Sequence, residues 1–307
     1  MREPDKGELG TLRDWVRWGA SQFSAAGLCF GHGTGNAIDE ALALVLAAVH
    51  LGHEIPAEFL DARVTAVEAE QILGLFRERV ERRIPAAYLI GEARFAGLDF
   101  HVDSSVLIPR SPIAELVEEG FAPWLDPAHV TSVLDLCCGS GCIGIACAKV
   151  FPHALVDLVD VSPDALEVAS RNIDRHQLEH RVRPVLSDLF EGLDGEPYDL
   201  IVSNPPYVSR AEMNVLPDEY LHEPALALVA GEDGLDVVAR ILAQSAEYLR
   251  PGGIIVVEVG SSAEALLARY PGVPFLWLDF ERGGDGVFLL TAEQLDEYRE
   301  LFEEAVE

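Results

Sequence analysis

The chain has 307 residues, 49% of them hydrophobic, which is enough for one large core or for two domains. Its 52 acidic and 22 basic side chains give a formal net charge of −30, which disfavours broad contact with a phosphate backbone and favours a basic protein as partner. The sequence has no transmembrane run, no signal peptide and an odd number of cysteines, five, so we expect a cytoplasmic protein without a membrane partner.

The first part of the chain has the periodicity of helices. Apolar residues recur at near-helical spacing between residues 8 and 83, and the stretch 64–80 is clearly amphipathic. No strand pattern occurs before residue 88. We expect residues 1–87 to form a helical domain.

Residues 88–112 are predicted to be a hairpin linker. The stretch 92–102 alternates around Gly97, which is suited to a tight turn. Ser111 is a good N-cap and Pro112 a good first helical residue, so we expect a helix from there to about Leu125.

From residue 113 to residue 307 the pattern predicts one catalytic domain of α/β class. Strands are predicted at 131–136, 154–160, 182–187, 198–203, 252–260, 273–280 and 286–291, with helices in most gaps. Alternation of this kind produces a mostly parallel, Rossmann-like sheet with helices on both faces. The last two strands are joined by too short a segment for a crossover, so we expect them to pair antiparallel.

A glycine-containing turn follows the first strand of this domain. It runs from Asp135 through Cys137, Gly139 and Gly141, where glycines let a ligand approach the backbone. The next strand ends in Asp160, at the distance where doubly wound folds place an acid that binds ribose hydroxyls. A dinucleotide such as NAD remains an alternative, because Gly139-x-Gly-x-x-Gly144 also satisfies its spacing.

The fourth strand leads into Asn204-Pro205-Pro206-Tyr207, and the third ends at Asp188. Two prolines make the segment stiff and remove N–H donors, while leaving carbonyl acceptors. Such a segment can hold an –NH2 group between the side-chain oxygen of Asn204 and a proline carbonyl, under the ring of Tyr207. With Asp188, this motif favours S-adenosyl-L-methionine over NAD.

These motifs resemble those of class I S-adenosylmethionine-dependent methyltransferases, and more narrowly of the HemK/PrmB family of protein-(glutamine-N5) methyltransferases. The resemblance covers nearly the whole chain, including Ile108-Pro-Arg110, 222–228 and 231–236. Residues 108–113 and 135–142 are most similar to the PrmB branch, which modifies a glutamine of the third large-subunit ribosomal protein. Cys138 departs from the Thr that is common in that branch.

The resemblance implies S-adenosyl-L-methionine as cofactor and S-adenosyl-L-homocysteine as product. It also implies that residues 1–87 recognise the substrate and that residues 113–307 form the catalytic domain that binds the cofactor. Residues 137–141 would enclose its methionine end, Asp160 would bind the ribose, and Asp188 and Leu189 would lie by the adenine. The implied cofactor-binding residues are Asp135, Cys137, Cys138, Gly139, Ser140, Gly141, Asp160, Val161, Asp188, Leu189 and Asn204. The implied catalytic and substrate-binding residues are Asn204, Pro205, Pro206 and Tyr207, with Arg110 as a further substrate-binding candidate.

Other functions stay open on the sequence. A release-factor enzyme that modifies Gly-Gly-Gln is the nearest, followed by an adenine N6-methyltransferase, because an exocyclic amine fits the same motif. A non-catalytic ribosome assembly factor is the third. The acidic charge argues against direct nucleic-acid binding, although a solubilising surface explains that charge equally well.

Several side chains have simple structural explanations. Arg110 is a salt-bridge anchor or part of the site wall. The cysteines between 137 and 147 lack the spacing of a metal site, so we expect small buried residues and no metal. The basic cluster of Arg77, Arg79, Arg82 and Arg83 is expected on a solvated helix face.

Overall fold

The computed structural model describes residue 4 and residues 7–306. The chain forms two compact units: unit 1 is Met1–Ala93 with Pro217–His222, and unit 2 is Arg94–Leu216 with Glu223–Glu307. Each unit has its own hydrophobic core. The chain therefore passes between the units at three places, the first of them inside the predicted hairpin linker.

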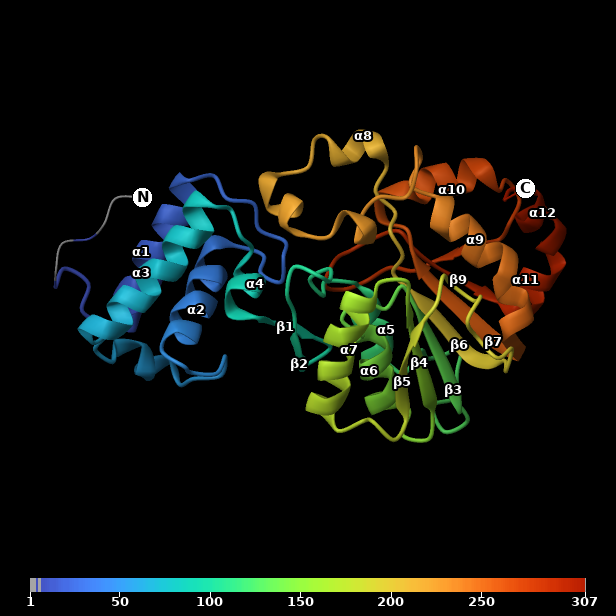
Figure 1. The fold of residues 1–307 in the computed structure, drawn as a ribbon, viewed down its shortest axis with the longest axis horizontal. Helices are drawn as coiled ribbons and strands as arrows, with labels where there is room; N and C mark the ends of the chain where they lie inside the picture. Colours follow the sequence, from blue (N-terminus) through green and yellow to red (C-terminus); the bar gives the residue numbers. More distant parts are fainter. Residues whose placement is uncertain (1–3, 5–6, 307) are drawn as a thin grey trace. The chain divides into compact units, whose positions relative to one another are not determined.

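Unit 1 is helical, as the periodicity predicts (Figure 1). The hydroxyls of Thr11 and Thr65 cap two of its helices by accepting a backbone N–H, and the acid three residues on accepts the N–H of the cap residue in return. Its elements are α1 (Leu12–Ala25), α2 (Ala37–Ala48), η1 (Ala57–Asp61), α3 (Ala66–Glu81), α4 (Ala86–Ile90) and the inserted η2 (Asp218–His222).

The core of unit 1 is aromatic and aliphatic. Phe23 and Phe76 are fully buried with ring centroids 5.0 Å apart in an edge-to-face arrangement, and Trp18 stacks on Phe76. Leu44 and Ile72 complete this core from α2 and α3. Hydrophobic burial in this cluster therefore holds the three longer helices together.

Arg79 corrects the expectation of a solvated basic face, because this side chain is 1% exposed. Its Nε donates to Glu40 at 2.6 Å and its Nη1 to Glu219 at 3.2 Å, while Nη2 donates to the carbonyl of Cys29 at 2.7 Å. Burial of a guanidinium requires partners of this kind, and two acids supply them. Since Glu219 belongs to the inserted segment 217–222, this network anchors that segment within unit 1.

The predicted hairpin is present. Strands β1 (Glu92–Phe95) and β2 (Leu98–His101) form a two-stranded sheet. Ala96 and Gly97 between them both have positive φ, +46° and +74°, which two-residue hairpin turns of the primed types require.

The helix after the hairpin is shorter than expected. Helix α5 spans Ile113–Glu118 and does not continue to Leu125. The N-cap residue is Pro112 and not Ser111 as expected, so the helix begins one residue later, although Ser111 Oγ still accepts the N–H of Ile113 at 3.2 Å. The helix ends because Gly120 and Phe121 adopt left-handed φ values of +64° and +57°, and the Phe121 N–H turns back to the carbonyl of Leu116.

Within the described residues, unit 2 contains a seven-stranded sheet of order β5-β4-β3-β6-β7-β9-β8. The first five strands of that order are parallel, and β9 is antiparallel to both of its neighbours, as predicted for the last strand. The strands are β3 (Ser132–Leu136), β4 (Leu155–Asp160), β5 (Val182–Leu186), β6 (Tyr198–Ser203), β7 (Leu249–Glu258), β8 (Leu276–Trp277) and β9 (Val287–Thr291).

Two strand predictions need correction at their ends. Strand β8 has two residues where eight were expected, because it is an edge strand and Pro274 has no N–H for a ladder. Strand β7 begins at Leu249, three residues earlier than expected, with a register irregularity against β6 opposite Tyr198 and Leu200.

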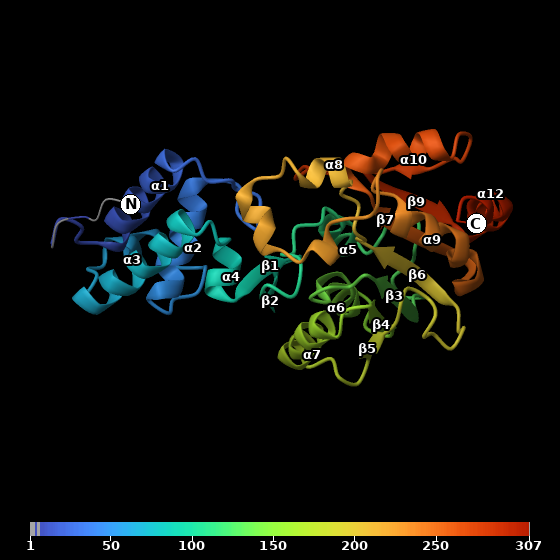
Figure 2. The ribbon, with the colours of Figure 1, turned by 45° about the horizontal axis from the view of Figure 1, so that its top comes forward.

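Helices cover both faces of the sheet (Figures 1 and 2). Alternate residues of each strand face opposite layers: Val133 packs with α5, α6 and α7, whereas Leu134 packs with α9 and the C-terminal helices. One layer contains α5, α6 (Cys142–Val150) and α7 (Pro163–His176). The other contains α9 (Asp236–Ser245), η4 (Ala246–Tyr248), α10 (Ala263–Arg269), α11 (Ala292–Glu297) and α12 (Arg299–Glu304).

A long loop follows β6. In unit 2 it contains α8 (Arg210–Met213) and η3 (Ala225–Ala227), and between them it runs through the inserted segment 217–222. Val208 donates to the carbonyl of Leu228 at 2.8 Å and accepts from the N–H of Ala230 at 3.0 Å, which closes the loop at its base. Among the described residues no helix is long and apolar enough to cross a membrane.

Candidate active site

A cavity of about 330 Å³ opens at the carboxyl ends of the parallel strands of unit 2. Strand β3 has β4 as its neighbour on one side and β6 on the other, so the direction in which strands are added to the sheet reverses at β3. Ligands of open α/β sheets bind at such a switch point. Its size lies in the usual range of small-molecule pockets. The lining includes residues 105–111, 137–140, 159–162 and 187–189, together with Asn204, Pro206, Leu226 and Arg240.

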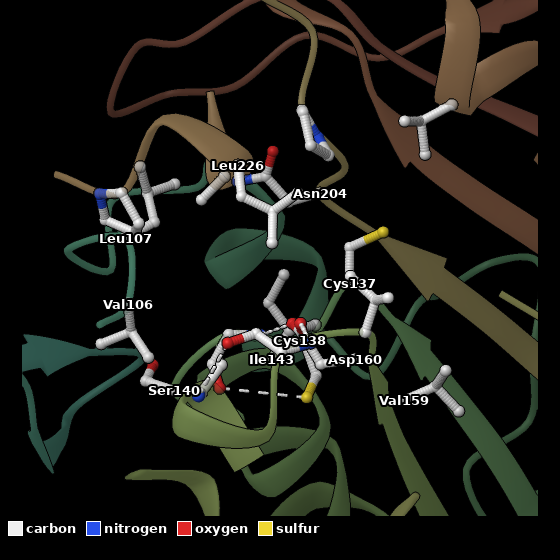
Figure 3. Close-up of a pocket in the computed structure, with 18 of the residues that line it drawn as sticks. Val106, Leu107, Cys137, Cys138, Ser140, Ile143, Val159, Asp160, Asn204 and Leu226 are labelled. Atoms are coloured by element: carbon white, nitrogen blue, oxygen red, sulfur yellow. Dashed lines mark hydrogen bonds between the residues drawn. The ribbon is translucent and has the colours of Figure 1, made fainter. Parts of the chain in front are cut away.

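The turn after β3 forms one wall (Figure 3). Cys137, Gly139 and Gly141 have φ values of +57°, +53° and +77°, so the backbone turns sharply before α6 begins. A Cβ built on Gly139 would meet no atom within 4 Å, whereas one on Gly141 would lie 2.8 Å from the side chain of Leu158. Gly139 therefore leaves room at the cavity, and Gly141 lets the turn pack on β4.

Asp160 ends β4 and lines the same wall. Its two carboxylate oxygens accept the backbone N–H groups of Gly139 and Ser162, each at 2.9 Å, so the carboxylate is held rigidly. Burial raises the pKa of Asp160, and these hydrogen bonds oppose the rise. The remaining lone pairs can accept hydroxyl groups, which fits the predicted ribose contact.

Asp188 and Leu189 follow β5 and line the cavity beside Arg240 of α9. Arg240 Nη2 lies 3.0 Å from Asp188 Oδ2, and this ion pair was not expected from the sequence. Leu189 has a left-handed φ of +51°, which is rare for a side chain of its kind. Val161, half exposed, completes the predicted residues of this part of the wall.

Asp135 is not at the cavity surface but behind it. Its carboxyl is almost completely buried, and Oδ2 accepts the N–H of Gly144 at 2.8 Å. Burial raises the pKa of Asp135 to about 8, and the charge of Asp160 adds to the rise. Burial therefore favours the protonated form of Asp135, which supports the turn from within. Gly141 likewise does not belong to the lining residues.

The thiols around the turn are inert. Cys138, Cys142 and Cys147 are buried, as predicted, whereas Cys137 is only partly buried; all five cysteines of the chain, each among the described residues, are free. Burial raises the pKa of Cys142 to about 12 and also raises the pKa of Cys137. A protonated, buried thiol is a poor nucleophile, so these side chains provide no covalent catalyst.

The motif after β6 forms the opposite wall. Figure 3 shows Asn204 and Leu226 on one side of the cavity and Asp160, Cys138 and Ser140 on the other. The side-chain oxygen of Asn204 is buried and has no hydrogen-bond partner within the described part of the chain. A buried acceptor left in this state is suited to a ligand donor, since an unmade hydrogen bond there costs about 1–3 kcal/mol.

Asn204 and Pro206 line the cavity, whereas Pro205 and Tyr207 do not belong to the lining residues. Tyr207 is held elsewhere: its hydroxyl donates to Glu258 at 2.8 Å, and its carbonyl accepts from the hydroxyl of Ser262 at 2.8 Å. The structure thus brings two residues of the motif to the cavity surface and fixes the last one behind it.

Arg110 combines the two roles considered for it. It lines the cavity, and its guanidinium makes a two-pronged contact with Glu223, with Nη1–Oε1 and Nη2–Oε2 distances of 2.6 and 2.7 Å. The same Glu223 accepts the N–H of Ile108 at 3.0 Å. The pair therefore fixes the segment 108–110 to the end of the loop that follows β6.

Comparison with a solved structure defines the class of protein. The catalytic domain of hMettl16, solved in complex with MAT2A 3′UTR hairpin 6, superposes with a TM-score of 0.50 at 17% identity, over 78% of this chain and 86% of that one. At such identity the similarity concerns the fold. A profile described as methyltransferase small domain also matches residues 119–231. With the sheet order and the cavity at its carboxyl edge, the chain has the fold of a class I methyltransferase.

Two curated relatives identify the family. A ribosomal protein uL3 glutamine methyltransferase of Francisella tularensis subsp. tularensis is 48% identical over 295 residues, which cover 96% of this chain and 94% of the relative. A protein of the same name from Bordetella pertussis is 50% identical over 297 residues, covering 96% of this chain and 100% of the relative. The chain belongs to the family of ribosomal protein uL3 glutamine methyltransferases. The predicted class of enzyme, a protein glutamine methyltransferase, and the resemblance to the PrmB branch are confirmed.

Proposed function

We propose that this enzyme transfers a methyl group from S-adenosyl-L-methionine to the side-chain nitrogen of a glutamine in uL3, the third large-subunit ribosomal protein. The observation that carries the proposal is the buried, unpartnered side-chain oxygen of Asn204, which lies across the cavity from the glycine turn and Asp160. The names of the two relatives support uL3 as the acceptor. The enzyme's net charge of −30 favours a basic acceptor of this kind, encountered in the cytoplasm.

The residues of the β3–β4 wall fit the cofactor. The backbone at 137–140 would hold its methionine end, the fixed carboxylate of Asp160 its ribose hydroxyls, and Asp188 with Leu189 and Val161 its adenosine end. Asp135 and Gly141 would support that wall from behind. When bound, S-adenosyl-L-methionine supplies a methyl group on a positively charged sulfur.

The acceptor wall has to make a poor nucleophile reactive. A carboxamide nitrogen has its lone pair delocalised into the carbonyl, and acceptors on its two N–H groups increase its electron density as positive charge develops. We assign this role to Asn204 Oδ1, at the cavity, and to the carbonyl of the neighbouring Pro205. Pro206 and Tyr207 keep the segment rigid. Rigidity matters here because correct orientation of the reacting groups can lower the barrier by roughly 7–11 kcal/mol. No general base is needed, since the nitrogen becomes strongly acidic after transfer.

The test is a parallel methylation assay. The full chain is incubated with radiolabelled S-adenosyl-L-methionine in three parallel reactions. The acceptor is uL3 in the first, a release factor that contains Gly-Gly-Gln in the second, and DNA in the third. We expect label on one glutamine of uL3, located by mass spectrometry. Label confined to the release factor or to DNA would contradict the proposal. Binding of the cofactor without label on any acceptor would identify a non-catalytic assembly factor instead.

A further inference from the structure

Glu258, the last residue of β7, joins the two segments that form the acceptor side of the cavity. Its Oε1 accepts the hydroxyl of Tyr207 at 2.8 Å, and its Oε2 accepts the hydroxyl of Ser111 at 2.5 Å. Tyr207 ends the Asn-Pro-Pro-Tyr motif, and Ser111 ends the cavity-lining segment 105–111. One buried carboxylate therefore connects the two segments directly.

The ring of Tyr207 has no freedom to move away from this contact. A Cβ built on Gly260, two residues after Glu258, would lie 2.6 Å from Cε2 of Tyr207, so the ring rests directly on the glycine backbone. At its other end, the carbonyl of Tyr207 accepts the hydroxyl of Ser262. The hydroxyl, the ring and the backbone of Tyr207 are thus each held by the segment 258–262.

Ser111 is held in the same way. Its hydroxyl donates to Glu258 and also accepts the N–H of Ile113, which fixes the start of α5. Its neighbour Arg110 is locked by the two-pronged pair with Glu223. Both ends of the acceptor wall are therefore immobilised by buried acids.

Stability alone does not account for an acid at position 258. Glu258 is 5% exposed, and the cation that acts on it, Arg110, is paired with another acid, Glu223. Burial raises the pKa of Glu258, while the hydroxyls of Ser111 and Tyr207 and the more distant charge of Arg110 oppose the rise. Burial of a carboxylate without a paired charge is unfavourable, and an apolar residue of similar size usually gives a more stable core. Sites that are unfavourable for stability in this way are typical of groups retained for function.

We propose that Glu258 is a positioning residue for methyl transfer, which holds Tyr207 and Ser111 so that Asn204 and Pro205 present their oxygens at a fixed spacing. The inference rests on the proposed function. Glu258 does not line the cavity, so it acts through its two hydroxyl partners and not on the reacting atoms. Small errors in the placement of an acceptor reduce the rate strongly without preventing binding of the cofactor.

The experiment compares Glu258→Ala, Glu258→Gln, Tyr207→Phe and the double variant Glu258→Ala/Tyr207→Phe. For each we measure kcat and KM with uL3, the Kd for S-adenosyl-L-methionine by calorimetry, and Tm. The single variants Glu258→Ala and Tyr207→Phe are each expected to lower kcat about 10- to 100-fold, with the cofactor Kd within about twofold of the parent. The double variant should be no slower than Glu258→Ala, because the two residues act as a unit. Glu258→Gln keeps one acceptor oxygen and should recover part of the rate.

Val257→Ala is the matched control, because Val257 precedes Glu258 on the same strand and is fully buried in the layer of α9. It should lower Tm by removing core volume and leave kcat unchanged. A rate loss in Val257→Ala equal to that in Glu258→Ala would mean that destabilisation alone explains the effect, and would overturn the proposal. So would an unchanged kcat in Glu258→Ala, or full additivity with Tyr207→Phe.

Failure of the proposed function gives a different result. A parent enzyme that labels the release factor or DNA but not uL3 contradicts the assignment of the acceptor, and the same variants are then compared on the acceptor it does label. Loss of rate in Glu258→Ala on that acceptor still supports the positioning role. A parent that labels none of the acceptors overturns both proposals.

Discussion

Arg79 and Glu219 are 140 positions apart in the chain and form an ion pair with an Nη1–Oε1 distance of 3.2 Å. Both side chains are almost completely buried, at 1% and 2% exposure. Glu40 is a second acidic partner of Arg79, at 2.6 Å, and Arg83 Nη1 lies 3.3 Å from Glu219, so two acids face two guanidinium groups. Buried ion pairs therefore hold the inserted segment 217–222 within unit 1.

Glu219→Ala should destabilise the protein strongly. It leaves the guanidinium groups of Arg79 and Arg83 with one acid between them and removes the acceptor of the Cys29 N–H, so we expect a loss of about 3–5 kcal/mol in the free energy of unfolding. Urea titration followed by circular dichroism measures this loss. The matched control is Glu232→Ala, whose partner Arg210 and own side chain are both highly exposed and whose change should stay within about 0.5 kcal/mol. Equal effects of the two variants would refute the argument.

Asn204→Ala should nearly abolish methyl transfer. It removes an acceptor for one amide N–H, and loss of one preorganised hydrogen bond to a reacting group typically lowers kcat by about 10²–10³. The turn at 137–140 and Asp160 are untouched, so we expect the cofactor to bind with nearly the parent Kd in calorimetry. Full methyl incorporation by Asn204→Ala would exclude the proposed mechanism.

Asp135 should make stability fall as pH rises. Its pKa is raised from an ordinary value near 3.8 to about 8 in the fold, so the folded state binds a proton that the unfolded state has lost between these values. Its contribution is complete below pH 4 and is lost as pH rises through 8, with a slope of at most about 1.4 kcal/mol per pH unit. Asp135→Asn imitates the protonated side chain and should remove this slope.

The measurement for Asp135 is the difference between variant and parent in urea titrations at pH 5, 7 and 8.5, because other groups contribute equally to both proteins. We expect the variant to gain in relative stability as pH increases. A difference that does not change with pH would show that Asp135 is ionised in the folded protein.

Leu226→Ala should weaken the binding of the protein substrate. Leu226 is 60% exposed although it lines the cavity beside Asn204, which places an apolar surface where the glutamine side chain must enter. Covering it with substrate would contribute about 1.5 kcal/mol, so we expect KM for uL3 to rise about tenfold with little change in kcat. Val215→Ala is the control: Val215 belongs to the same loop, is 79% exposed and does not line the cavity. A rise in KM in both variants would contradict a specific role of Leu226.

Local patterns in the sequence predict much of this fold. The strands that lead to Cys137, Asp160, Asp188 and Asn204 are short, mostly apolar runs with polar residues after them, so the strands and the residues at their ends follow from the sequence. The glycine turn and the Asn-Pro-Pro-Tyr motif are local for the same reason. These features need no knowledge of distant contacts.

The missed features depend on contacts between distant segments. The charge of Arg79 indicates a solvated face until Glu40 and Glu219 are placed beside it. No local pattern in the sequence predicts that residues 217–222 belong to unit 1. Glu258 had a visible signal, an acid that follows four apolar strand residues, but its partners Ser111 and Tyr207 come from elsewhere in the chain.

The insertion of residues 217–222 limits how this enzyme can be divided. A cut after Ala93 separates the N-terminal helices from the rest of the chain but leaves six residues of unit 1 on the other fragment. That fragment carries Glu219 without Arg79, on the same loop that starts from Tyr207. The two units are therefore not interchangeable modules, and a chimera with the helices of a relative has to exchange both pieces of unit 1 together.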